Sequence, residues 1–242
     1  MRVKLRLFVT ATDTGVGKTE AACALLSLLA EAGERPAPFK PYESGCADLA
    51  RPPDALALQA AAGSDLPLER VCPHRFTAPL APGVAARRLG EEPDFEKTLA
   101  AFRSFEGRSL VVEGAGGLFV PIDSQRDVID LIEALRLPVL LVARAGLGTL
   151  NHTALSLEAL AHRRIEVRAV LLSKSSLTPL PVGEGKGEGP MNTEDPSEAD
   201  NAVLLEERHR MRVLGPVPFI ADAKARRLAF RATLAGLVGV SG

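Results

Sequence analysis

Residues 10–19, TATDTGVGKT, combine residue types that could hold the phosphates of a nucleotide. Backbone N–H groups of a glycine-containing turn can point inward at phosphate oxygens, and a helix that begins there adds its positive dipole end. Lys18 would bring a point charge to the β- and γ-phosphates, and the Thr19 hydroxyl would bind Mg²⁺. This stretch therefore predicts a nucleotide-binding loop.

The loop departs from the usual phosphate-loop pattern at one position. The pattern G-x-x-x-x-G-K-[ST] has glycine where this chain has Thr12, so Gly15 and Gly17 are expected to supply the flexible backbone. A chance G-x-G-K-T in an ordinary turn is the alternative. The apolar run before the loop and the helical pattern after it favour nucleotide binding, because a phosphate loop needs that strand–loop–helix context.

Three further charged residues are expected beside this loop. Lys40 follows a predicted strand, which would place it at the carboxyl edge of a sheet, where ligands bind. Asp54 is placed to be the N-cap of a helix, and Glu113 to end a strand before a glycine-rich turn. Their carboxylates could bind Mg²⁺ together with the Thr19 hydroxyl. The alternatives are a solvated lysine, a plain helix cap and a surface charge.

Short apolar runs alternate with longer helical stretches along the chain. Strands are predicted at 5–10, 37–40, 109–113, 138–143, 167–173 and 213–216, and helices at 20–31, 54–62, 95–105, 127–135, 149–163 and 224–237. Continuous runs rich in Val and Leu suit strands that are buried on both faces. The alternation predicts an α/β fold with one doubly wound, mostly parallel sheet and helices on both faces, as in P-loop NTPases.

The composition fits one domain that spans residues 1–242. The chain is 46% hydrophobic and 24% charged, and its formal net charge is −1. Neither a nucleic-acid-binding surface nor a membrane-attracted surface is expected from this balance. The segment 175–199 is rich in Gly, Pro, Ser and Glu and has no hydrophobic period, so it is predicted to be a flexible loop within that domain.

The cysteines and the first residues favour a cytoplasmic protein. Cys23, Cys46 and Cys72 are widely separated and lack metal-binding spacing, which fits reduced thiols in a cytosol. Cys23 is expected in the core. The basic and then apolar start is too short for a signal peptide and leads directly into the loop, so a core strand is expected there. No apolar stretch approaches membrane-spanning length.

Five segments resemble motifs of the dethiobiotin synthetase family, in the order in which that family has them. They are TDTGVGKT at 12–19, FKPYESG at 39–45, PDALALQ at 53–59, VEGAGG at 112–117 and GLGTLNH at 146–152. The resemblance implies the conversion of 7,8-diaminononanoate, CO₂ and ATP into dethiobiotin, ADP and phosphate. It also implies Mg²⁺ as cofactor and a homodimer in which one subunit completes the substrate site of the other.

The same resemblance implies roles for individual residues. Catalysis would involve Lys40, Lys18 and Thr14, and the metal ion would be surrounded by Thr19, Asp54 and Glu113. Nucleotide binding would involve Gly15, Val16, Gly17, Lys18, Thr19, Glu20, Asp54, Glu113, Gly114, Ala115, Gly116, Lys174 and Pro218. The substrate would contact Ser44 and the helix start formed by Thr149, Leu150 and Asn151, whose backbone N–H groups could hold a carboxylate.

Differences from related motifs leave some questions of specificity open. Lys174 and Ser175 stand where the family commonly has an Asn-Asp pair suited to adenine, so the base preference is open. A ParA/MinD-like ATPase switch is the main alternative, but its loop carries a second lysine where this chain has Asp13, followed by Thr14. An amide-forming synthetase domain of cobalamin synthesis and a nucleotide-binding regulator without catalytic activity are further alternatives.

Overall fold

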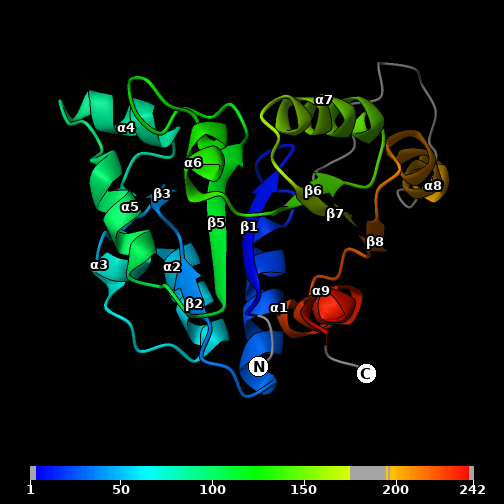
Figure 1. The fold of residues 1–242 in the computed structure, drawn as a ribbon, viewed down its shortest axis with the longest axis horizontal. Helices are drawn as coiled ribbons and strands as arrows, with labels where there is room; N and C mark the ends of the chain where they lie inside the picture. Colours follow the sequence, from blue (N-terminus) through cyan, green and yellow to red (C-terminus); the bar gives the residue numbers. More distant parts are fainter. Residues whose placement is uncertain (1–3, 175–194, 196, 240–242) are drawn as a thin grey trace, which may run out of the picture.

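The computed structural model describes residues 4–174, 195 and 197–239. The main feature of these residues is a six-stranded parallel sheet. The strand order is β2-β5-β1-β6-β7-β8, and every adjacent pair is parallel. The strands are β1 (Arg6–Ala11), β2 (Ala37–Phe39), β5 (Leu110–Gly117), β6 (Val139–Arg144), β7 (Val167–Ser173) and β8 (Val213–Val217). The strand that leads into the phosphate loop, β1, therefore lies in the middle of the sheet, between β5 and β6 (Figure 1).

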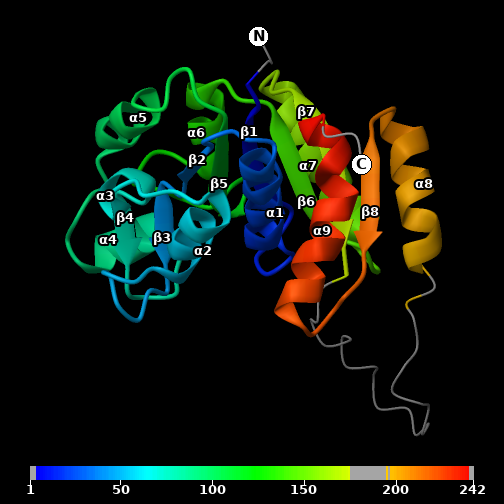
Figure 2. The ribbon, with the colours of Figure 1, turned by 90° about the horizontal axis from the view of Figure 1, so that it is seen from below.

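Helices cover both faces of this sheet. One face packs against α1 (Lys18–Glu31), α2 (Pro53–Ala62) and α9 (Ala223–Val238), and the other against α5 (Phe95–Arg103), α6 (Val128–Leu135), α7 (Thr149–His162) and α8 (Ser197–His209). Helices α1 and α9 lie side by side (Figure 2). The predicted doubly wound α/β fold with helices on both faces is confirmed.

Strand β6 shows why the sequence produces two apolar layers. Leu140 and Val142 pack with α1, whereas Val139 and Leu141 pack with α6. Successive side chains of a strand point to opposite faces, so a strand between two helical layers must be apolar at every position. The sequence VLLVA is therefore buried throughout.

A small second sheet lies at one edge of the molecule and was not expected from the sequence. Strands β3 (Tyr42–Ser44) and β4 (His74–Phe76) pair in parallel, and the short helices α3 (Leu68–Val71) and α4 (Pro82–Arg88) are close by in the chain. These elements, together with α2 and α5, gather beside the β2–β5 edge of the main sheet (Figure 1). The sequences of β3 and β4, YES and HRF, form no apolar run that would indicate a strand.

Part of the predicted flexible loop is helical. Helix α8 begins at Ser197, so the C-terminal end of the prediction for 175–199 is wrong. Glu198 and Asp200 lie in its first turn, where acidic side chains are stabilised by the helix dipole. Residues 175–194 and 196 lie outside the described residues.

The three cysteines are buried free thiols. Cys23 lies in the α1 face of the core and is 2% exposed, as predicted. In the ranges that the structure describes, no helix is both long and apolar enough to cross a membrane.

Candidate nucleotide and catalytic site

The phosphate loop connects β1, which ends at Ala11, to α1, which begins at Lys18. Gly15 and Gly17 have φ angles of 75° and 102°, in the left-handed region that side chains disfavour, so the prediction that these glycines supply the flexible points is confirmed. Val16 lies between them with its side chain buried in the core. Val16 therefore anchors the loop. Gly15 faces open space, whereas Gly17 lies close to the side chains of Phe230 and Ser173.

A cluster of side chains that includes the buried Lys40 and Glu113 lies directly beside the loop. The Lys40 ammonium donates to Glu113, with Nζ 2.6 Å from Oε1, and its Nζ lies 3.1 Å from Oδ2 of Asp54. The Thr19 hydroxyl donates to the same Oε1 of Glu113 at 2.8 Å. Four residues from four separate segments therefore meet at one point, next to the start of α1.

The positions of the two carboxylates in their elements differ from the predictions. Asp54 is not an N-cap: Pro52 holds that position, and Asp54 is the second residue of α2. The side chain of Asp54 turns to Lys40 because an ion pair is available there. Glu113 does not end its strand, because β5 continues to Gly117. Glu113 is 1% exposed and is held inside the sheet by the lysine and the threonine.

The two lysines of the site differ in their electrostatics. Burial alone would lower the pKa of Lys40, but the carboxylates of Glu113 and Asp54 outweigh it and raise the pKa, so this lysine stays charged. Burial, reinforced by the charge of Lys40, lowers the pKa of Lys18 to about 8. Lys18 donates to the carbonyl oxygen of Asp13 at 2.9 Å, which holds its ammonium over the loop.

The residues around Glu113 fit a divalent cation. Its second carboxylate oxygen, Oε2, is buried and has no hydrogen-bond partner among the described residues. An orphaned buried carboxylate oxygen is costly unless a cation or donor meets it. The described residues contain no group of three or more His, Cys, Asp or Glu arranged for a metal. A magnesium ion here would use Glu113, Asp54, the Thr19 hydroxyl and phosphate oxygens, which is the kind of set that Mg²⁺ adopts with nucleotides.

These groups open into a cavity of about 570 Å³. Of the residues predicted for the site, those that line it are Thr14, Gly15, Gly17, Lys18, Thr19, Glu20, Lys40, Ser44, Asp54, Glu113, Ala115 and Gly116. A cavity of this volume is in the range of small-molecule sites. The main chain of Gly114, behind the cavity, accepts a hydrogen bond from Lys40 at 3.2 Å.

Other predicted site residues lie away from this cavity. Lys174 follows β7 and pairs with Glu198 of α8, and the exposed Pro218 follows β8. Glu20 lines the cavity but also pairs with Arg226 of α9, at 3.1 Å. Lys174 is thus paired with α8, and Glu20 with α9.

The predicted substrate-binding helix start does begin a helix. Helix α7 starts at Thr149, after Gly148 in a left-handed conformation. Thr149 is buried and Asn151 is exposed. Within the described part of the chain, none of the residues lining the cavity comes from α7.

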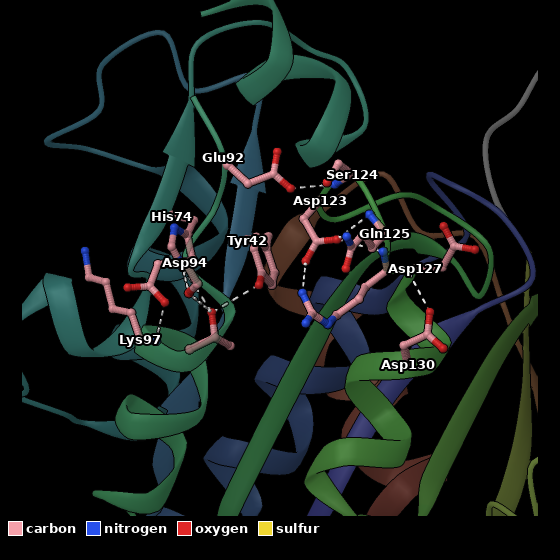
Figure 3. Close-up of polar contacts among 12 residues, drawn as sticks. Tyr42, His74, Glu92, Asp94, Lys97, Asp123, Ser124, Gln125, Asp127 and Asp130 are labelled. Carbon is pink, nitrogen blue, oxygen red and sulfur yellow. Dashed lines mark hydrogen bonds and ion pairs between the residues drawn. The ribbon is translucent and has the colours of Figure 1, made fainter. Parts of the chain in front are cut away.

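Two residues of the cavity wall, Tyr42 and Glu43, were not singled out from the sequence. Both belong to β3, whose sequence YES forms no apolar run. The strand was therefore not predicted, and the direction of its side chains could not be inferred. The Tyr42 ring stacks on His74 at 4.9 Å between centroids, and the Tyr42 hydroxyl accepts from Thr98 at 3.1 Å (Figure 3). Burial raises the pKa of Tyr42 to about 12, so the phenol is neutral.

The loop between β5 and α6 forms the neighbouring wall, through Val120. Asp123 holds this loop from within: its Oδ1 accepts from the backbone N–H of Gln125 and of Arg126, and its Oδ2 pairs with the Arg126 guanidinium (Figure 3). The Ser124 N–H donates to Glu92 at 2.8 Å. The cavity is therefore framed by a loop with fixed polar contacts.

A glycine turn joins the central strand to a helix, next to a lysine, a threonine and the carboxylates of Asp54 and the buried Glu113. This arrangement defines the class of this protein. It is a P-loop α/β nucleotide-binding protein. The family model described as "AAA domain" matches residues 5–227. The ATP-dependent dethiobiotin synthetase BioD of Anaeromyxobacter dehalogenans (strain 2CP-C) is 42% identical over 234 residues, which cover 96% of this chain and 98% of that protein. The chain belongs to the family of ATP-dependent dethiobiotin synthetases.

A more distant protein is consistent with this assignment. The ATP-dependent dethiobiotin synthetase BioD of Nitrosospira multiformis is 34% identical over 227 residues, covering 92% of each chain. The family resemblance read from the five sequence segments is thus confirmed.

Proposed function

We infer that this chain is an ATP-dependent ligase that forms the ureido ring of dethiobiotin from 7,8-diaminononanoate, CO₂ and ATP. The observation that carries this inference is the cluster of Lys40, Asp54, Glu113 and Thr19 beside the phosphate loop. The relatives of this chain are named for this activity. The cluster provides the charged groups that phosphoryl transfer to a carbamate needs.

The reaction has three bond-forming steps. One amine of the substrate attacks CO₂ and loses a proton to give a carbamate. A carbamate oxygen then attacks the γ-phosphorus of ATP, which forms a carbamoyl phosphate and releases ADP. The second amine attacks the carbamoyl carbon, loses a proton and expels phosphate, which closes the ring. Phosphorylation is needed because an unactivated carbamate oxygen is a poor leaving group.

We propose that the protein contributes mainly positioning and charge. Lys18, at the start of α1, would neutralise the phosphoryl group during transfer, and Lys40 would stabilise both that group and the carbamate. The exposed loop residue Thr14 would lie next to the γ-phosphate or the carbamate. Ser44, in the cavity wall, would contact the substrate.

We propose that Thr19, Asp54 and Glu113 hold Mg²⁺, because their oxygens converge and one oxygen of Glu113 lacks a partner in the described chain. When bound, Mg²⁺ would offset the negative charge of the phosphates. The glycines of the loop and the backbone of residues 114–116 would bind the phosphates. Lys174 and Pro218 would lie toward the base, whose identity stays open.

We further propose a homodimer in which the partner subunit's α7 start supplies Thr149, Leu150 and Asn151 to the substrate. Two features support this. Within the described chain these residues do not line the cavity, and Leu147, just before the helix, is 71% exposed. The N–H groups at the start of a helix suit the distant carboxylate of the substrate.

We also propose that residues 1–242 act as one domain in the cytoplasm, without a nucleic-acid or membrane partner. The small sheet supports a single domain, because Tyr42 and Ser44 line the same cavity as the phosphate loop. The three free buried thiols fit a reducing compartment.

The test is dethiobiotin formation by the purified protein from 7,8-diaminononanoate, bicarbonate, Mg²⁺ and ATP, followed by mass spectrometry with one ADP released per product. Omitting any one substrate should abolish the product. ATP hydrolysis that depends on DNA or lipid, with no dethiobiotin formed, would contradict the proposed function and favour a switch ATPase.

A further inference from the structure

The first turn of α2 lacks a cap of its own. Its N-cap residue, Pro52, has no side-chain oxygen, and Pro53 at the first helical position has no N–H. The N–H of Leu56 already bonds to the carbonyl of Pro52 at 3.1 Å. The first-turn donors that remain to be satisfied are the N–H groups of Asp54 and Ala55, and Ala55 is fully buried.

Glu43 satisfies both of these donors from the small sheet. Its Oε1 accepts from the N–H of Asp54 at 2.8 Å, and its Oε2 accepts from the N–H of Ala55 at 2.9 Å. The Glu43 side chain is buried, with the residue 3% exposed, and it lies in the cavity wall. A carboxylate at a helix N-terminus also interacts favourably with the helix dipole. One buried side chain thus provides the whole missing cap.

This cap fixes the backbone of Asp54, whose carboxylate belongs to the charged cluster beside the phosphate loop. The backbone N–H of Asp54 bonds to Glu43, and its side chain pairs with Lys40 at 3.1 Å. Lys40 precedes β3 and Glu43 lies within it, three residues later in the chain. One short segment therefore contacts both the backbone and the side chain of Asp54.

We propose that Glu43 is a positioning residue of this site, which holds the backbone of Asp54 so that its carboxylate stays beside Lys40, where it would bind Mg²⁺ together with Glu113. The inference rests on the proposed role of Asp54 and Glu113 in metal binding. Groups that orient metal ligands typically change metal affinity by about 10- to 100-fold when removed. Glu43 acts through the backbone of Asp54 and does not itself contact the metal.

Binding of a fluorescent ATP analogue, measured with Mg²⁺ and again with EDTA, tests this. Glu43→Ala should weaken binding about tenfold or more in Mg²⁺ and less than about twofold in EDTA. Glu43→Gln should recover part of the loss, because the amide keeps one acceptor oxygen for one of the two N–H groups. An equal loss in Mg²⁺ and in EDTA would overturn the proposal.

A double mutant separates action through Asp54 from an independent effect. Adding Glu43→Ala to Asp54→Asn should weaken Mg²⁺-dependent binding no further than Asp54→Asn does alone, whereas additive losses would overturn the proposal. If Glu43→Ala does not fold, Glu43→Gln carries the same comparison. Asp94→Ala is the matched control: it removes the cap of α5, whose Asp94 accepts from the N–H of Lys97, and should leave the Mg²⁺ dependence unchanged.

The Mg²⁺-dependent binding of the ATP analogue is measured independently of product formation. If the wild-type protein binds nucleotide in a Mg²⁺-dependent way but makes no dethiobiotin, the proposed function fails while the role of Glu43 is still tested. If the wild-type protein makes dethiobiotin and Glu43→Ala leaves Mg²⁺-dependent binding intact, only the role of Glu43 fails.

Discussion

Lys40 and Glu113 form an ion pair inside the protein, with Nζ 2.6 Å from Oε1 and side chains that are 5% and 1% exposed. Glu113 accepts the Thr19 hydroxyl at the same oxygen. The pair therefore connects the phosphate loop with β2 and β5, and a change at either residue is expected to affect both stability and chemistry.

Replacing Lys40 by Gln should lower turnover about 100- to 1,000-fold, because a charged donor to the transferring group is lost. Nucleotide affinity should change little, since Lys18 and the loop backbone remain. Initial rates of dethiobiotin formation and calorimetric titration with ATP would measure the two effects. Near-normal turnover would remove Lys40 from the mechanism.

Replacing Lys40 by Met should also destabilise the fold, by about 3–5 kcal/mol, because Glu113 is left buried and unpaired. The loss should be smaller in Lys40→Met/Glu113→Gln, where no buried charge remains. Urea denaturation measures the free energy of unfolding of both variants. Lys4→Met is the control, since its ion pair with Glu34 involves a half-exposed lysine and should contribute less than about 1 kcal/mol. An equal loss of unfolding free energy in Lys40→Met and in Lys40→Met/Glu113→Gln would contradict this explanation.

Gly17→Ala should abolish nucleotide binding. Gly17 has a φ of 102°, and an added Cβ would lie 3.0 Å from Cζ of Phe230 and 3.3 Å from Oγ of Ser173. Gly33 has a similar φ of 81° but open space around it. Gly33→Ala should therefore cost only the backbone strain, about 1 kcal/mol, and keep nucleotide binding intact. The nucleotide affinity of both variants is measured by equilibrium binding of a fluorescent nucleotide. An equal loss of affinity in the two variants would show that the contact with Phe230 is unimportant.

Stability should fall as the pH drops below about 6.5, in part because of His74. Burial lowers the pKa of His74, so the folded protein resists a proton that the unfolded chain accepts. The unfolded state therefore gains protons first as the pH falls, and the free energy of unfolding decreases. His74→Phe keeps a ring over Tyr42 and should have a shallower loss between pH 7.5 and 5.5. Urea denaturation at both pH values compares the variants, and parallel curves would exclude His74 as a contributor.

Much of the fold followed from local patterns in the sequence. The continuous apolar run of β6, the run of Ala and Leu in α1 and the glycines of the phosphate loop each depend on residues close together in the chain. Such patterns specify elements because backbone conformation and the alternation of side chains are short-range properties. The short strands β3 and β4 were missed, since their sequences, YES and HRF, form no apolar run.

The contacts of the charged residues could be seen only in the folded chain. Asp54 could be read as a cap, but the folded chain places its side chain on Lys40 and leaves capping to Glu43. Glu113 could be read as the end of a strand, but it is a buried partner of a lysine 73 residues away. The energy of a buried charge depends on which groups surround it in space, and sequence spacing does not contain that information.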